Sequence, residues 1–281
     1  MAEYDELASV YGMMLEIAPE DANLWVARAI VVARLGDSES AIDDLMQMEQ
    51  IDPARGAAWV NVAGAASGQR HYHAAIEIST AGLDIHQELV SLWMTRGLAL
   101  LSLDEEEEAL ADFEQAAALD TTSVQAHLWR GRALRALDQI EESIEASQLA
   151  AELGAEGGVA GANSGFEAMA DAADAIALSN PSDAFEYLAN QVFIYGSREA
   201  ILLGYARVDY RRGSVDLAVG RLNRLVFDGY LTALLWRGII LADEGDDEEA
   251  IADLEAFLEI RASGPEAEQA RALLERLEAG E

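Results

Sequence analysis

The chain contains no cysteine, no lysine and only four prolines among its 281 residues. Without cysteine it can form neither a disulfide framework nor a zinc-cysteine site, and it has no thiol nucleophile. Scarce proline permits long helices, and an aromatic content of 7% suits helices packed through alanine and leucine better than a β-sandwich. No apolar run reaches the length of a transmembrane helix, so we expect no membrane insertion. The acidic N-terminal stretch lacks the basic region of a secretory signal, and the expected location is the cytoplasm.

Basic residues are few, and every one of them is arginine. Eighteen bases face 52 acids, which gives a formal net charge of −34. This excess disfavours nucleic acid, because phosphate binding needs clustered positive charge, and it disfavours anionic membrane surfaces. Two interpretations stay open: an acidic surface for a basic partner, or an adaptation to high intracellular salt, which screens self-repulsion. The acids are spread along the whole chain, which favours the second.

A period of 34 residues organises the chain. Tryptophan and alanine recur at this step, at Trp25, Trp59 and Trp93 and at Ala41, Ala75 and Ala109. Each period reads as two amphipathic helices joined by a tight turn, as in Leu92–Asp120, where Ala109, Phe113 and Ala116 follow the i, i+4, i+7 spacing of one helix face. One such pair cannot bury both of its faces, so neighbouring copies must stack on it.

The pattern resembles the tetratricopeptide repeat family, whose units carry an early tryptophan, a small residue four places later and an alanine in the second helix. In the first unit these places are filled by Trp25, Ala29 and Ala41, and Pro53 closes the unit. The resemblance implies an all-α fold, an α-solenoid in which helix-turn-helix units build a right-handed superhelix. It also implies a protein without enzymatic activity that binds other proteins.

The repeats divide the chain into five expected parts. These are an N-terminal capping helix at 1–21, four repeats over 22–157, a glycine-rich insertion or hinge at 158–164, three more divergent repeats over 165–264, and a C-terminal capping helix at 265–281. The hinge is inferred from Gly154–Gly165, where five glycines in twelve residues are poor helix material. The second repeat departs from the pattern at Ser79 and Gly82, and the fourth at His127 and Ser143.

Arginines stand out against the acidic background in two stretches, 124–137 and 196–228. Two pairs share a helix face at i, i+3 and i, i+4 spacing. The resemblance places these arginines and two tryptophans on first helices that face the concave surface, namely Arg132, Arg135, Arg207, Arg211, Trp129 and Trp236. Guanidinium groups beside an exposed tryptophan favour an acidic or C-terminal peptide. The alternative is that these arginines pair with neighbouring acids between repeats.

The N-terminal half of the expected groove is apolar instead, with Val26, Ile30, Met94, Leu98 and Leu101 on its inner face. Some members of the family grip a C-terminal carboxylate with a set of Lys, Asn and Arg side chains across three units. Here only Asn61 stands at such a place, so that clamp is absent. An apolar half and an arginine-bearing half together favour an acidic amphipathic segment as the ligand.

Catalytic and metal-binding motifs are not found. His71 and His73 offer two imidazoles at i, i+2 without a third ligand nearby. The acid runs Asp104–Glu108 and Asp243–Glu249 fall at helix starts, where carboxylates cap free amides. No nucleophile elbow or phosphate loop occurs, so we expect no enzyme, no metal and no cofactor.

The sequence therefore predicts an interaction adaptor or scaffold that binds a protein segment, a peptide or a helix, in the groove of the superhelix. Two alternatives stay open. One is a self-assembling structural scaffold, a homo-oligomer in which an end helix or the acidic face of one copy enters the groove of another. The other is a regulatory subunit of a larger enzyme complex.

Overall fold

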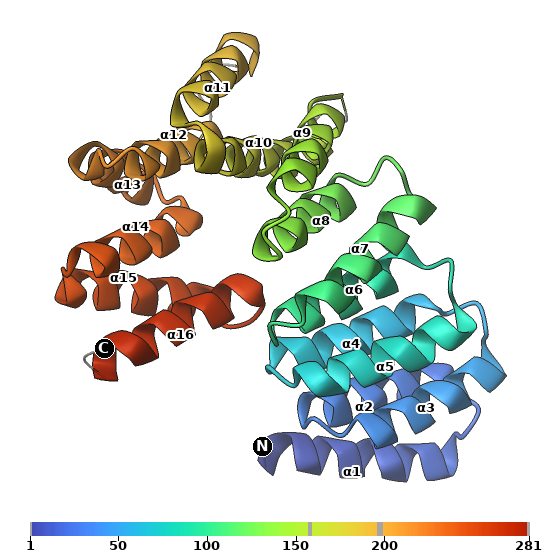
Figure 1. Cartoon of the computed structure of the whole chain (residues 1–281). Coiled ribbons are helices and arrows are strands. Elements are labelled where there is room, and N and C mark those ends of the chain that lie inside the picture. The colour runs from blue at the N-terminus through green and yellow to red at the C-terminus, as the bar shows by residue number, and fades with distance from the viewer. Residues whose placement is uncertain (1, 157–158, 196–198, 280–281) are drawn as a thin grey trace. The chain divides into compact units, whose positions relative to one another are not determined.

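The computed structural model of the chain describes residues 2–156, 159–195 and 199–279. These residues form sixteen helices and no strand, and the helices pack in consecutive pairs (Figure 1). The predicted all-α class of helix-turn-helix repeats is confirmed. Two compact units can be distinguished, one of Met1–Asp120 with Ser263–Pro265 and one of Thr121–Ala262 with Glu266–Glu281. Within the described ranges, no helix is both long enough and apolar enough to cross a bilayer.

The first unit consists of one leading helix and three helix pairs. Its helices are α1 (Ala2–Ile17), α2 (Ala22–Arg34), α3 (Ser38–Ile51), α4 (Ala57–Gly68), α5 (Tyr72–Ile85), α6 (Val90–Leu101) and α7 (Glu106–Leu119). Each first helix packs on the second helix of its own pair, and α2, α4 and α6 also contact one another in order. Alanines at these contacts let the helix backbones approach closely, while Leu45, Trp59 and Ile78 fill the centre of the core.

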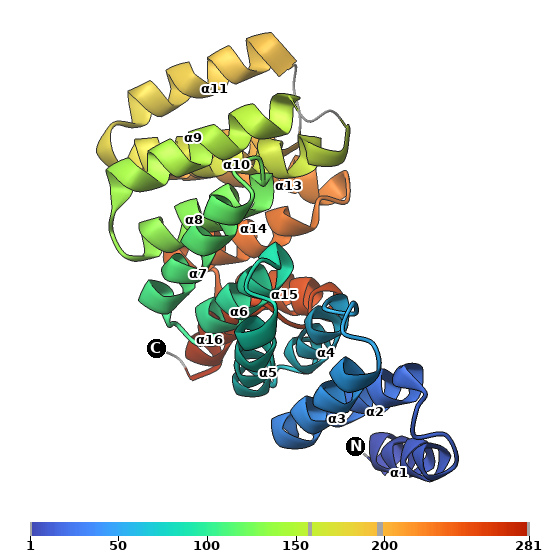
Figure 2. The same cartoon turned by 90° about the vertical axis from the view of Figure 1, so that its right-hand side faces the viewer.

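The second unit continues the same construction. Its helices are α8 (Val124–Ala136), α9 (Ile140–Glu156), α10 (Val159–Ser179), α11 (Pro181–Tyr195), α12 (Glu199–Arg211), α13 (Val215–Phe227), α14 (Leu231–Glu244), α15 (Asp247–Ile260) and α16 (Pro265–Ala279). The 21-residue α10 contacts α8, α9, α11 and α12, and this makes it the central helix of the unit (Figure 2).

The side chain at the early tryptophan position forms a hydrogen bond with the turn that precedes its repeat. Trp25 and Trp93 each donate a hydrogen bond from Nε1 to the backbone carbonyl six residues earlier, at 2.7 and 2.8 Å. His127 departs from the pattern in residue type but makes the same bond, from Nε2 to the carbonyl oxygen of Thr121 at 3.1 Å. The ring therefore satisfies a carbonyl of the connecting turn, which explains why a ring N–H donor is placed there.

The second repeat uses its tryptophan differently. Trp59 is fully buried and donates from Nε1 to the Glu49 carboxylate at 2.8 Å, and His86 Nε2 lies 2.7 Å from the same oxygen. A Cβ on Gly82 would lie 3.0 Å from Trp59 atoms. The departure at Gly82 thus follows from the space that a buried indole requires.

Arginine–aspartate pairs join the two helices of three repeats. Each pair is bidentate with N–O distances of 2.5 to 2.9 Å and spans 16 residues, as in Arg28–Asp44, Arg96–Asp112 and Arg237–Asp253. In the fourth repeat Arg130 keeps the arginine, but Ala146 takes the place of the aspartate. The Nε atom of Arg130 is buried and has no hydrogen-bond partner among the described residues.

The glycine-rich stretch is helical wherever it is described. The sequence favoured a break over Gly154–Gly165, whereas α9 extends to Glu156 and α10 begins at Val159. A Cβ on Gly165 would lie only 2.8 Å from the Cα of Gly154. These two glycines are therefore needed where α9 and α10 cross with their backbones in contact, and there the absence of a side chain outweighs the poor helix propensity. The part of the predicted hinge at 157–158 lies outside the described residues.

Candidate functional site

A cavity of about 340 Å³ opens between α2 and α4 in the first unit. Its wall is mostly apolar, with a few polar side chains, and consists of Asn23, Val26, Ala27, Ile30, Arg55, Ala57, Ala58 and Asn61. Three residues predicted for the groove, Val26, Ile30 and Asn61, are thus brought together in one hollow. Consecutive first helices place them there, because α2 packs directly against α4.

The polar groups that line this cavity differ in whether they already form hydrogen bonds with other side chains of the protein. Arg55 donates from Nη2 to the Asn23 side-chain oxygen at 2.8 Å, so these two side chains hold each other. Asn61 is exposed, and its amide makes no hydrogen bond to another described residue. An amide offers two donor hydrogens and a carbonyl acceptor. Asn61 can therefore pair with both the N–H and the C=O of an extended backbone.

The other apolar residues predicted for the groove lie on α6. Met94, Leu98 and Leu101 are all half-buried there. They do not line the cavity between α2 and α4. The apolar surface of the first unit is therefore composed of a hollow between the first two repeats and half-buried side chains on the third.

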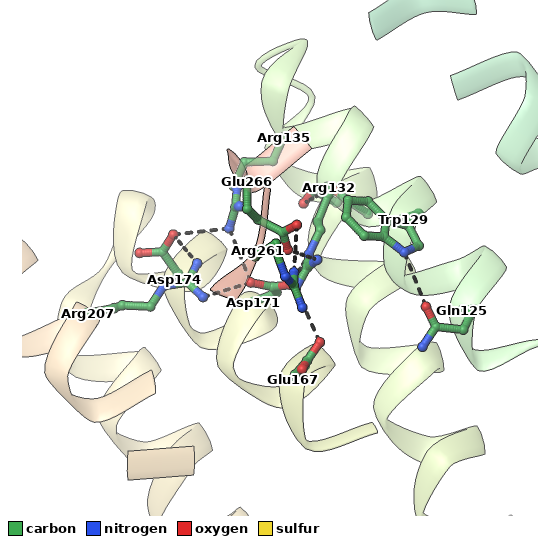
Figure 3. A network of polar contacts seen from close by, with 12 residues as sticks. Gln125, Trp129, Arg132, Arg135, Glu167, Asp171, Asp174, Arg207, Arg261 and Glu266 are labelled. Atoms are coloured by element: carbon green, nitrogen blue, oxygen red, sulfur yellow. Dashed lines mark hydrogen bonds and ion pairs between the residues drawn. The ribbon is translucent and has the colours of Figure 1, made fainter. Parts of the chain in front are cut away.

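In the second unit the four predicted arginines converge on α10, and Figure 3 labels three of them, Arg132, Arg135 and Arg207. Arg207 donates from Nη1 to Asp171 and from Nη2 to Asp174, both at 2.7 Å, and all three side chains are buried. Arg132 donates from Nε to Asp171 at 2.7 Å. Arg135 donates from Nη1 to Asp174 at 3.1 Å. Helices α8 and α12 thus supply cations to two carboxylates one helical turn apart on α10.

The cluster continues toward solvent through weaker contacts. Arg211 reaches Asp174 with Nε at 3.2 Å. The Glu266 carboxylate on α16 bridges Arg132 at 3.1 Å and Arg261 at 2.9 Å. Glu167 lies 3.6 Å from Arg132. Five arginines and four carboxylates therefore nearly neutralise one another within the second unit.

Both predicted tryptophans stack on arginines of this cluster. The Arg132 guanidinium lies 4.5 Å from the Trp129 ring centroid, and the Arg207 guanidinium lies 4.3 Å from that of Trp236. These distances are within the range of a cation–π contact. The indole rings hold the guanidinium planes in the orientation in which their N–H groups meet the aspartates.

Burial and charge act in opposite directions on the two aspartates. Burial alone would raise the pKa of Asp171, but the Arg132 and Arg207 guanidiniums overcome it and hold that pKa well below its usual range. The same balance of burial against Arg207 and Arg135 brings the pKa of Asp174 to about 2. Both carboxylates are therefore ionised at neutral pH.

Arg135 is the least favourably placed cation of the cluster. Burial lowers the pKa of its guanidinium, and the positive charges of Arg207 and Arg132 add to this effect in spite of the nearby aspartates. Its side chain is 25% exposed and that of Arg211 is 36% exposed, against 3% for Arg207. Of the four predicted arginines, Arg135 and Arg211 are thus the two whose guanidiniums an outside carboxylate could reach most easily.

Asp171 and Asp174 were not singled out from the sequence. They lie in ADAADAIA, where two acids three residues apart interrupt a run of alanines and one isoleucine. Charges in an otherwise apolar helix are the signal that could have found them, since a buried carboxylate needs a buried cation. Their partners lie 33 to 39 residues away, which no local pattern reveals.

The paired histidines do not form a metal site. His71 is half-buried against the turn at Gly36, and His73 is exposed. Among the described residues, no group of three or more His, Cys, Asp or Glu side chains is arranged to hold a metal ion. The acid-rich surface therefore offers no metal centre in the part of the chain that the structure covers.

Comparison with known families finds two matching models, both described as the tetratricopeptide repeat. One covers residues 203–267 and the other residues 90–122. The chain is also 29% identical over 83 residues to the small glutamine-rich tetratricopeptide repeat-containing protein 2 of Mycosarcoma maydis. This match covers 30% of the chain and 24% of that protein, so the chain spans about a quarter of this relative's length.

Solved structures resemble the fold over most of the chain. A tetratricopeptide repeat protein from Parabacteroides merdae superposes with a TM-score of 0.61 at 18% identity, over 91% of this chain and 98% of that one. The APC/C hetero-tetramer Cut9–Hcn1 gives a TM-score of 0.50 at 17% identity, over 91% of this chain and 48% of that one. At these identities the likeness concerns the fold alone.

Proposed function

Because this chain is a tetratricopeptide repeat protein, we propose that it is a non-enzymatic adaptor or scaffold that binds a peptide or helix on its first helices. Proteins of this family generally mediate protein–protein interactions. The observation that carries the proposal is the cavity between α2 and α4, which combines an apolar wall with the unengaged amide of Asn61.

Binding at this cavity would use two kinds of contact. An apolar side chain of the ligand enters the hollow against Val26 and Ile30, which supplies affinity through burial of apolar surface. Asn61 pairs with the ligand backbone and fixes its direction. Such a division, with apolar anchors and a few convergent polar groups, is typical of peptide-binding grooves.

The arginine cluster would add selection for acidic ligands. Arg132 and Arg207 already hold buried carboxylates of this chain, so among the four predicted arginines selection falls mainly to Arg135 and Arg211, the two more exposed ones. A carboxylate that approaches them meets a cluster with one more arginine than carboxylate. This supports an acidic amphipathic segment as the preferred ligand.

The test is capture of partners from a lysate of the source cell, compared across matched variants. Asn61→Arg fills the cavity mouth without touching the core, because Asn61 is exposed. Gln69→Arg adds the same charge at an exposed turn outside the cavity. We expect partners that bind wild type and Gln69→Arg but not Asn61→Arg, and, as a separate effect in the second unit, weaker capture of acidic partners by the Arg135→Glu/Arg211→Glu variant.

The opposite pattern would refute the proposal. If every captured partner is retained by both Asn61→Arg and Arg135→Glu/Arg211→Glu, the first helices do not form the binding surface. Thermal melting of each variant by circular dichroism verifies that lost binding does not reflect lost folding.

A further inference from the structure

Helix α13 presents an apolar stripe to solvent. Leu217 is 60% exposed and Phe227 is 86% exposed, although both are large apolar side chains. Gly220 and Arg224 lie between them, so the four positions follow i, i+3, i+7, i+10 spacing along one helix face. A Cβ on Gly220 would meet no atom within 4 Å, so the surface between the two apolar ends is open.

Helix α1 carries a second stripe of the same spacing. Leu7, Val10, Met14 and Ile17 stand at i, i+3, i+7, i+10, and all four are exposed, Ile17 by 85%. The neighbouring Met13 is exposed as well. Helix α1 therefore buries one face on α2 and leaves an apolar face uncovered.

The two stripes match in length and in pattern. Ten residues separate the first and last member of each stripe, which corresponds to about 15 Å of helix. Alternating steps of three and four residues form the seam along which two helices pack with interdigitating side chains. Gly220 has no side chain to obstruct a partner helix, and the methionines of α1 are flexible enough to pack over the open surface there.

The two stripes also differ in charge. Helix α1 contains four acids, Glu3, Asp5, Glu6 and Glu16, and no base. One of the two inner positions of the α13 stripe is Arg224, whose side chain is 75% exposed and whose Nε contacts Asp228 at 2.9 Å. In a chain with a net charge of −34, an exposed arginine within the stripe favours an acidic partner helix, whose carboxylate can reach the guanidinium N–H groups that Asp228 leaves open.

We propose that α1 of one copy packs against α13 of a second copy. The two surfaces are different and each occurs once per chain, so the contact is head-to-tail and links copies into open chains or closed rings. The contact is separate from the proposed peptide site, since neither stripe includes a residue of the cavity between α2 and α4. Net repulsion between acidic copies opposes it, so association should strengthen as salt screens that repulsion.

The experiment is sedimentation velocity of the full chain over a wide range of concentrations, at low and at high salt. The wild type is expected to form larger species as concentration and salt rise. Val10→Gln/Ile17→Gln removes the α1 surface, and Leu217→Gln/Phe227→Gln removes the α13 surface. Each variant alone should associate at least about tenfold more weakly, because it removes the most exposed apolar side chains of its stripe.

A mixture of the two variants provides the decisive measurement. Each variant retains the surface that the other has lost, so together they should form a one-to-one dimer and nothing larger. The control is Ile51→Gln/Ile260→Gln, which removes two exposed isoleucines outside both stripes and should associate like the wild type. A wild type that is monomeric throughout would overturn the proposal, as would unchanged association of either stripe variant or a mixture without dimers.

Discussion

The substitution Asp171→Asn tests how the second unit is held together. Asp171 accepts charged hydrogen bonds from Arg132 and Arg207, both at 2.7 Å, in a buried position. Asparagine keeps the volume but removes the negative charge, so two guanidiniums lose their shared carboxylate. Breaking one side of a buried ion pair costs about 3–5 kcal/mol. Because Arg132 keeps Glu266 and Arg207 keeps Asp174, we expect the lower end, about 3 kcal/mol.

Glu167→Gln is the matched control on the same helix. Glu167 lies one turn before Asp171, and its carboxylate is 3.6 Å from Arg132 with much of its side chain exposed. A partly exposed contact of this kind contributes about 1 kcal/mol at most. The two substitutions make the same chemical change at positions that differ chiefly in burial.

Native-state hydrogen exchange is the appropriate assay, because repeat arrays open region by region rather than all at once. We expect Asp171→Asn to lower the protection of the α10 and α12 amides on the order of a hundredfold, which corresponds to about 3 kcal/mol. Protection in α2–α5 should not change. Equal losses for Asp171→Asn and Glu167→Gln, or a loss below about 1 kcal/mol for Asp171→Asn, would refute the reasoning.

Further predictions concern the loss of stability at acid pH, the missing carboxylate partner of Arg130, the close contact at Gly97 and the effect of salt on the melting temperature. The folded-state pKa of Asp174 is about 2, below the unfolded value of about 3.9, so its stabilisation is complete above the unfolded value and is lost as the pH falls to about 2. The difference in α10 protection between wild type and Asp174→Asn should therefore vanish over that range. Ala146→Asp supplies the carboxylate that Arg130 lacks and should stabilise α8 and α9 by about 1 kcal/mol, measured by exchange against Ala146→Asn. Gly97→Ala places a Cβ 2.7 Å from a phenylalanine ring and should cost about 1–3 kcal/mol, whereas Gly64→Ala, which meets nothing within 4 Å, should be neutral or stabilising in urea unfolding. If the acidity is an adaptation to salt, the melting temperature should rise steeply between low and molar salt, and a flat response would favour a basic partner instead.

The repeat period predicted most of the fold. Tryptophan recurs where a ring must hydrogen-bond to a turn, and alanine and glycine recur where two helix backbones approach closely. Both requirements concern residues of the same or the adjacent helix pair. Pro53 lies in a turn and Pro265 is the first residue of α16, where proline needs no helical hydrogen bond. The helicity of the described part of Gly154–Gly165 was not predicted because helix propensity describes an isolated helix, while the packing of α9 on α10 depends on a partner that the local sequence does not show.

The candidate site was predictable only in part. The resemblance to the repeat family assigned Val26, Ile30 and Asn61 to one surface, since the same step relates α2 to α4. It also assigned the four arginines to first helices and left open whether they meet a ligand or neighbouring acids, and each of them contacts Asp171 or Asp174. Whether an arginine faces solvent or a carboxylate depends on pairs such as Arg207 with Asp171, which join separate helices.

The bond from the early ring to the carbonyl six residues before it also bears on how the chain folds. Trp25, Trp93 and His127 each join a helix to the turn that leads into it, so the link between successive repeats is formed by residues close in sequence. Contacts of short sequence separation carry little loop-closure entropy and form early. A nascent chain can therefore fix the entry to these three repeats as soon as the first helix of each has formed, and folding can proceed repeat by repeat during synthesis.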